Sequence, residues 1–95
     1  MTKTSDTSQT KAYSRAEGLE VVAVPDGYVV YNDTRSMVHY LNPTASMVLE
    51  LCDQCVDAAA MARRMQAIFE LPAPPDSDVD LCLAQLLDQH LIHRT

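Results

Sequence analysis

Short apolar runs separated by polar stretches mark the first half of the chain. β-Branched and aromatic residues form three runs, at residues 19–24, 28–31 and 37–41. The first two are separated by Pro25, Asp26 and Gly27, residues that favour a tight turn, and a polar stretch separates the second from the third. Runs of this composition at this spacing predict three antiparallel strands joined by hairpins.

After the third run the apolar positions recur at helical spacing. Asn42 and Pro43 are residue types favoured at the N-cap and the first position of a helix, so a helix is expected to begin here and to reach about residues 52–55. Asp57 can cap a second helix, which should end before the prolines that follow it. The apolar stripes of these two helices are Ala45, Val48, Leu49 and Cys52, and Met61, Met65, Ile68 and Phe69.

A third helix is expected near the end of the chain, capped by Asp76 or Ser77. Its apolar stripe is Val79, Cys82, Leu83, Leu86 and Leu87. The predicted fold is therefore α+β and winged-helix-like, with a three-stranded antiparallel sheet followed by three helices. Residues 1–18 are rich in Ser and Thr and nearly free of apolar side chains, which predicts a disordered tail before a domain at residues 19–95.

Length and charge narrow the classes of protein. The 95 residues are enough for one domain, and the net charge is −6. Nucleic-acid binders need a basic face, and Arg63–Arg64 is the only pair of adjacent arginines, so nucleic acid is not an expected partner. The chain lacks a signal-peptide pattern and an 18-residue apolar run, so we expect no membrane segment and a cytoplasmic location.

Candidate catalytic and metal-binding residues are few. Cys52 and Cys55 form a CxxC pair, but structural zinc requires a second pair of ligands at a defined spacing, and Cys82 falls on an apolar stripe. There is no phosphate-binding glycine loop and no Ser/His/Asp signature. We therefore expect no enzyme activity, no catalytic residue, no metal and no cofactor.

Four segments, taken in order, resemble the PqqD family of peptide chaperones and, more broadly, the RiPP recognition elements that hold leader peptides for modifying enzymes. The segments are residues 27–45, 49–53, 61–69 and 78–92, so the resemblance covers nearly all of the predicted domain. Gln54 and His90 stand where the family usually has glycine at a helix C-terminus. Both residue types reach the left-handed conformation at a modest cost.

The resemblance implies that a leader peptide adds as a strand to the free edge of the third strand, residues 37–41. Its apolar side chains would enter a groove between that strand and the third helix. The residues in question are Met37, Val38, His39, Tyr40 and Leu41 on the strand, and Val79, Leu83, Leu86 and Leu87 on the helix, with Asp80 at the rim for a basic leader residue. Strand alternation separates Met37, His39 and Leu41 from Val38 and Tyr40, and it leaves open which set faces inward.

The first hypothesis is thus a stand-alone chaperone that binds the leader of a ribosomally made precursor and presents it to a modifying enzyme, of the radical SAM type that such chaperones often serve. A winged-helix regulatory or DNA-binding domain is the alternative, and a purely structural subunit is a third. A symmetric homodimer through the open edge strand would compete with peptide. The sequence does not identify which precursor peptide or which modifying enzyme is the partner.

Overall fold

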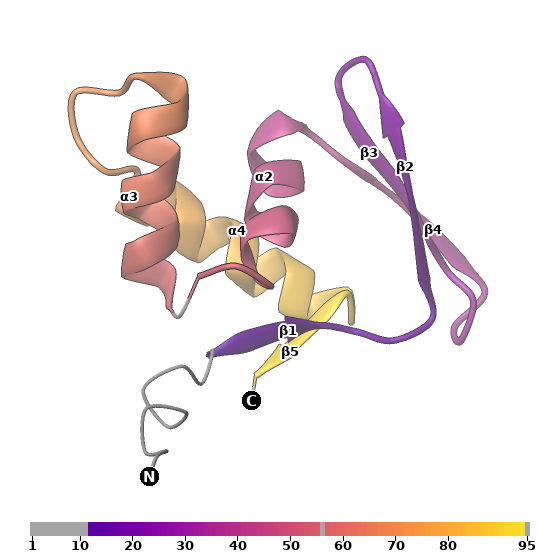
Figure 1. The fold of residues 1–95 in the computed structure, drawn as a ribbon. Helices are drawn as coiled ribbons and strands as arrows, with labels where there is room; N and C mark the ends of the chain where they lie inside the picture. The colour runs from indigo at the N-terminus through magenta and orange to yellow at the C-terminus, as the bar shows by residue number, and fades with distance from the viewer. Residues whose placement is uncertain (1–11, 56, 95) are drawn as a thin grey trace, which may run out of the picture.

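The computed structural model describes residues 12–55 and 57–94, in which a sheet stands beside a group of helices (Figure 1). The strands are β1 (Tyr13–Arg15), β2 (Leu19–Val24), β3 (Gly27–Asn32), β4 (Met37–Leu41) and β5 (Ile92–Arg94), and the helices are α2 (Pro43–Leu51), α3 (Ala58–Phe69) and α4 (Asp76–Asp88). The predicted three-stranded antiparallel sheet followed by three helices is confirmed. The more specific likeness to a winged helix stays a prediction.

The sheet has the strand order β2–β3–β4 with both neighbouring pairs antiparallel, so β2 and β4 are its edges. The turn between β2 and β3 falls at the predicted Pro25–Asp26 position. Gly27 follows it at a φ of 146°, and a Cβ there would collide with the carbonyl oxygen of Leu41. Glycine is therefore required for β4 to pass close to the start of β3.

Two of the three predicted helix caps are confirmed. Oδ1 of Asn42 accepts a 2.8 Å hydrogen bond from the amide of Ala45, and Oδ1 of Asp57 accepts one of 2.8 Å from the amide of Ala60. The prediction for α4 was wrong by one position, because Asp76 is its first helical residue and Pro75 occupies the cap without a side-chain hydrogen bond. Asp76 and Asp78 in the first turn instead place negative charge at the positive end of the helix dipole.

Residues 13–15 and 92–94 form a second, two-stranded sheet that the sequence did not predict. We expected a tail through residue 18, but β1 pairs antiparallel with β5, with Ser14 opposite His93. Nη2 of Arg15 also bonds Oε1 of Glu50 at 3.0 Å, and its Nε lies 3.1 Å from Oδ2 of Asp53. These contacts join β1 to the helices, so the described part of the predicted tail belongs to the fold. Residues 1–11 lie outside the described residues.

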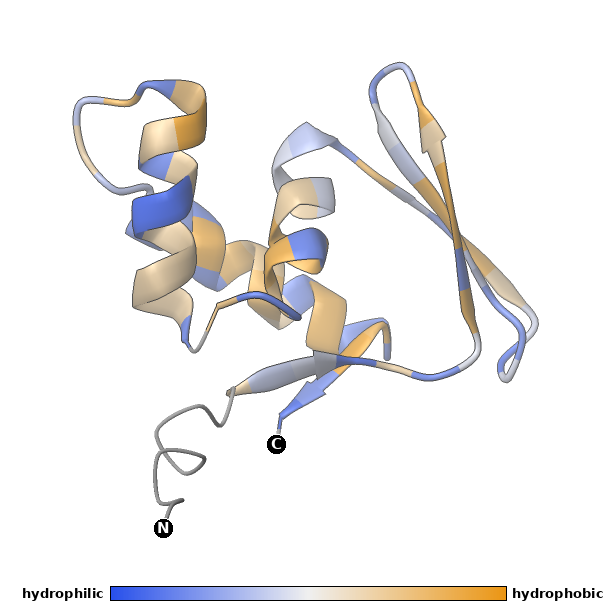
Figure 2. Cartoon of the chain, in the orientation of Figure 1, coloured by the Kyte–Doolittle hydropathy of each residue, from blue (hydrophilic) through white to orange (hydrophobic). Residues whose placement is uncertain are grey.

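The core lies between the sheet and the helices, with α2 in contact with β3, β4, α3 and α4. Its largest fully buried side chains are Leu49, Leu51, Met61, Met65, Leu86, Leu91, Val30, Val48, Val79 and Cys52. Figure 2 shows hydrophobic residues on the sheet strands as well as on the helix faces. The predicted stripe of α3 is only partly buried, because Ile68 and Phe69 at its C-terminal end are 46% and 42% exposed.

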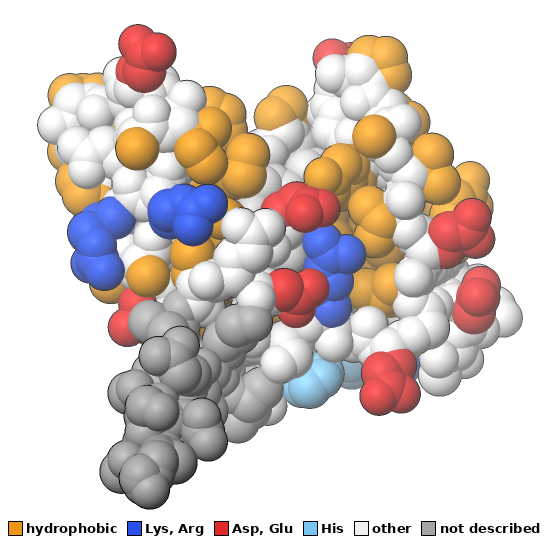
Figure 3. Space-filling view, viewed as in Figure 1, with side chains coloured by type: hydrophobic (Ala, Val, Ile, Leu, Met, Phe, Trp, Pro, Cys, Tyr) orange, Lys and Arg blue, Asp and Glu red, His pale blue; other side chains and the backbone are white. Residues whose placement is uncertain are grey.

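Both apolar and basic side chains reach the surface. Figure 3 shows apolar side chains in the hollow between the helices and the sheet, and basic side chains on the outer side of α3, where Arg63 and Arg64 are exposed. Nη2 of Arg64 bonds Oε1 of Gln54 at 3.4 Å. The adjacent arginines therefore belong to a solvent-exposed helix face away from β4.

Candidate functional site

The register of β4 against β3 decides which of its side chains face the helices. His39 is opposite Val30 and Leu41 is opposite Tyr28, and Val30 is fully buried. Residues directly opposite each other in an antiparallel pair share a face. Met37, His39 and Leu41 therefore lie on the side of the helices, and the question that strand alternation left open is answered.

The other face of β4 is open to solvent. Val38 is 61% exposed and Tyr40 is 58% exposed. The Tyr40 hydroxyl donates a 2.7 Å hydrogen bond to the carbonyl oxygen of Asp26, which ties the end of β4 to the β2–β3 turn. Because β4 is also a sheet edge and has no charged residue, its outer backbone groups are accessible and lack the charges that usually block pairing with another strand.

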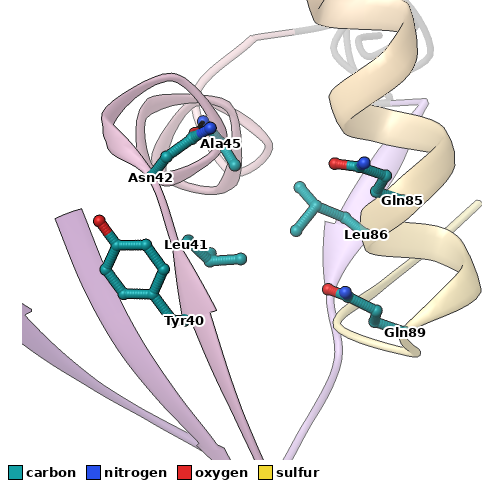
Figure 4. A pocket seen from close by; sticks show the side chains of 7 residues that line it. All are labelled: Tyr40, Leu41, Asn42, Ala45, Gln85, Leu86 and Gln89. Carbon is teal, nitrogen blue, oxygen red and sulfur yellow. Dashed lines mark hydrogen bonds between the residues drawn. The ribbon is translucent and has the colours of Figure 1, made fainter.

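A cavity of about 260 Å³ lies between the end of β4 and α4 (Figure 4). We call it the strand cavity, and it is lined by Tyr40, Leu41, Asn42, Ala45, Gln85, Leu86 and Gln89. Leu41 and Leu86 point toward one another from the two sides, whereas the Tyr40 ring lies on the far side of its strand. Gln85 and Gln89 extend from α4 on either side of Leu86. The strand cavity thus combines an apolar floor with hydrogen-bonding amides.

The corner between β4 and α2 holds Leu41 in place. The Ser46 hydroxyl is within hydrogen-bonding distance of two carbonyl oxygens, those of Leu41 at 3.1 Å and Asn42 at 2.8 Å. Ser46 is buried, and the Asn42 side chain caps the same helix. Since these bonds fix the backbone where strand becomes helix, they also fix the wall of the strand cavity that Leu41 and Asn42 supply.

The strand cavity includes only part of the predicted strand and helix residues. Of the residues predicted on α4, Leu86 alone lines the strand cavity. Val79 and Leu83 are buried in the core, and Leu87 is half-buried. Asp80 is exposed, and it lies about two and a half helical turns before Gln89, which places the two side chains on opposite sides of α4. The structure therefore does not place Asp80 at the rim of this cavity.

Sequence reasoning missed the polar part of the lining. Gln85 and Gln89 are one helical turn apart, so they share a side of α4, and Asn42 was considered only as a cap. The spacing of the two glutamines could have indicated a polar strip on the helix. It could not have indicated that this strip faces β4, because the rotation of α4 is set by its packing on α2 and α3.

His39 and the cysteines have no assigned chemistry at this site. His39 is half-buried, and its Nε2 is shielded from solvent without a hydrogen-bond partner among the described residues. Cys52, Cys55 and Cys82 are free and buried, and burial raises the pKa of the Cys52 thiol to about 12, helped by the charge of Asp53. Within residues 12–55 and 57–94, no three His, Cys, Asp or Glu side chains are grouped as metal ligands.

None of the helices in the described residues has the length and apolar character needed to cross a membrane. Comparison with known protein families gave a match. The family model described as coenzyme PQQ synthesis protein D (PqqD) matches residues 27–92, from the first residue of β3 to the first residue of β5. No curated protein and no solved structure matches the chain. Since the family model covers most of the chain, including β4, α4 and the strand cavity between them, the chain belongs to the PqqD family.

Proposed function

We propose that this protein binds the leader segment of a ribosomally made precursor peptide at the edge of β4 and presents the precursor to a modifying enzyme. Membership of the PqqD family implies a peptide-binding partner protein in the biosynthesis of PQQ and related peptide products. Capture at β4, presentation to an enzyme and the radical SAM type of that enzyme are parts of the proposal.

The observation that carries the proposal is the uncharged free edge of β4 next to the strand cavity. A peptide that adds to such an edge gains backbone hydrogen bonds, and alternate side chains point to the same face. One set would enter the strand cavity, between Leu41 and Leu86, and the amides of Gln85 and Gln89 could bond its backbone or polar groups. The other set would lie beside the exposed side chains of Val38 and Tyr40.

The charge of α4 supports peptide over nucleic acid. Asp76, Asp78, Asp80 and Asp88 lie on this helix, which has no Lys or Arg. A helix that reads DNA needs basic side chains near the phosphates. The alternative of a DNA-binding domain therefore has no support from the helix that would have to carry it.

The test is a change of the β4 backbone, measured with peptides selected from a displayed random-sequence library against the full chain. Val38→Pro removes one backbone donor and constrains φ at the edge. We expect the variant to lose most of its affinity for the selected peptides, and NMR shifts on binding to concentrate at residues 37–41 and at Gln85, Leu86 and Gln89. Ala23→Pro on the other edge strand, β2, is the matched control, because Ala23 lies outside the hydrogen-bonded pairs with β3, and it should keep its affinity.

Three results would count against the proposal. Unchanged affinity of a folded Val38→Pro variant would exclude strand addition at β4. Shifts confined to α3 would place the peptide elsewhere. A dimer that pairs through β4, detected by concentration-dependent sedimentation and broken by Val38→Pro without any effect of peptide, would identify a second copy as the occupant of the edge.

A further inference from the structure

The strand cavity continues along α4, away from the sheet. It shares Asn42 and Gln85 with a second cavity of about 270 Å³, which also contacts Leu81. The second cavity shares Thr44 and Asp78 with a third of about 280 Å³. Because consecutive cavities share residues from both walls, the three follow one another along the same side of α4, and we call this row of cavities the α2–α4 groove.

The walls of the α2–α4 groove are the start of α2 and one side of α4. On α4 the groove runs from Gln89 to Asp78, about three helical turns or about 16 Å. An extended peptide covers that length with about five residues. The groove begins at Tyr40 and Leu41, where β4 ends, so a peptide strand that leaves the edge there arrives directly at its entrance.

The far end of the groove is apolar and open. Phe69, Leu71 and Pro75 line the third cavity, and Phe69 is 42% exposed although it ends the apolar stripe of α3. Leu81, in the middle, is 65% exposed. Covering exposed apolar side chains is favourable in proportion to the area removed from water. Among the described residues that line the groove, Asp78 is the one charged side chain.

We propose that the α2–α4 groove is a second subsite of the leader-binding site, which takes the flank of the same peptide that emerges beyond Leu41. This flank places an apolar side chain against Phe69 and Leu71 and a basic side chain beside Asp78. The inference rests on the proposed function, because the flank enters the groove only when the rest of the peptide is paired with β4. Its consequence is a recognition sequence of about ten residues, twice what the five-residue β4 can pair.

The experiment uses a peptide selected from the random-sequence library on the full chain, together with two truncated forms that lack one flank or the other. Phe69→Ser and Leu81→Ser remove the apolar contacts of the groove. Ile68→Ser is the matched control, because Ile68 is 46% exposed next to Phe69 and lines none of the three cavities. Leu81→Ser also serves as a second variant should Phe69→Ser unfold, since its side chain is the more exposed.

We expect Phe69→Ser and Leu81→Ser to weaken binding of the full peptide about tenfold each, and Ile68→Ser to leave it unchanged. The truncated peptide that lacks the flank extending past Leu41 should bind the wild type more weakly than the full peptide does. Neither Phe69→Ser nor Leu81→Ser should weaken the binding of this truncated peptide any further. Asp78→Asn should reduce the preference for Lys or Arg in that flank.

The two proposals fail in different ways. If Val38→Pro abolishes binding but both groove variants bind the full peptide as tightly as the wild type, the β4 site stands and the second subsite is refuted. If Ile68→Ser weakens peptide binding as much as Phe69→Ser does, the loss of affinity does not come from the groove, and the second subsite is again refuted. If no selected peptide depends on β4, the proposed function itself is refuted, and the inference falls with it.

Discussion

The hydroxyl of Tyr28 donates a 3.0 Å hydrogen bond to Oε1 of Glu50, and so links the sheet to α2. The same carboxylate oxygen accepts the 3.0 Å bond from Arg15. Burial raises the pKa of the Tyr28 hydroxyl, and the hydrogen bond to Glu50 and its negative charge raise it further. The phenol therefore keeps its proton at neutral pH and stays a donor, and one carboxylate joins β1, β3 and α2.

Tyr28→Phe removes this donor and leaves the ring in place. We expect the free energy of unfolding to fall by about 1 kcal/mol, the usual size of one hydrogen bond, as measured by urea denaturation. Tyr31→Phe is the control, because the Tyr31 hydroxyl makes no hydrogen bond to the described residues and its side chain is exposed. Equal losses in the two variants would show that the Glu50 bond contributes nothing.

Arg15→Ala tests whether β1 is part of the fold. Arg15 contacts Glu50 and Asp53, and all three side chains are partly exposed, so we expect a loss of about 1 kcal/mol in the free energy of unfolding. The loss should shrink in high salt, which screens exposed ion pairs. Arg35→Ala changes an exposed arginine whose side chain makes no hydrogen bond or ion pair with the described residues, so it should have no effect. A silent Arg15→Ala would restore the interpretation of this segment as a tail.

The contrast between predicted and missed elements has a physical cause. The strands of the meander and the caps at Asn42 and Asp57 depend on residues close together in sequence, so the pattern was sufficient. The β1–β5 pair joins Tyr13–Arg15 to Ile92–Arg94, each only three residues long. Neither segment has enough alternation to identify a strand, and nothing in the neighbouring residues indicates that these two segments pair.

The same limit applies to the residues of the candidate site. Alternation divided the side chains of β4 correctly into two sets, but only the pairing of His39 with Val30 shows which set faces the helices. Helical periodicity identified the buried stripe of α4. The residues beside a stripe occupy two flanks, and the choice between Asp80 on one and Gln89 on the other depends on tertiary packing.

His90→Gly and Gln54→Gly should have opposite effects, although the family usually has glycine at both positions. His90 adopts a φ of 62° at the end of α4, a conformation that costs a residue with a side chain about 1–2 kcal/mol. Glycine removes this cost but loses more entropy on folding, so we expect a net gain of about 0.5 kcal/mol. Gln54 does not have a positive φ, contrary to what the resemblance implied. Gln54→Gly therefore relieves no backbone strain and should only lower stability, because glycine loses more entropy on folding.

Thermal unfolding followed by circular dichroism measures both changes. The prediction requires a higher midpoint for His90→Gly than for the wild type and a lower one for Gln54→Gly. Glu70→Gly supplies a second comparison, since Glu70 has a φ of 55° at the end of α3 and should also gain. Lower midpoints for both His90→Gly and Glu70→Gly would mean that their side chains make contacts that outweigh the backbone cost.

Cys52 should make the protein less stable in alkaline solution. Burial, followed by the charge of Asp53, raises the pKa of its thiol from 9.0 to about 12. Between these values the unfolded chain loses a proton that the native state keeps. The stabilising contribution is thus complete below pH 9 and is lost as pH rises toward 12, by up to about 1.4 kcal/mol per pH unit.

Urea denaturation of the wild type and of Cys52→Ala between pH 9 and pH 12 tests this prediction. The quantity to compare is how steeply the free energy of unfolding falls with pH in each protein. The substitution leaves a cavity and lowers stability at every pH, but it should also make the decline above pH 9 shallower. Tyr28 and Cys82, whose pKa values are raised as well, are present in both proteins, so the difference between the two curves belongs to Cys52. Parallel curves would mean that the thiol ionises in the folded protein as readily as in the unfolded chain.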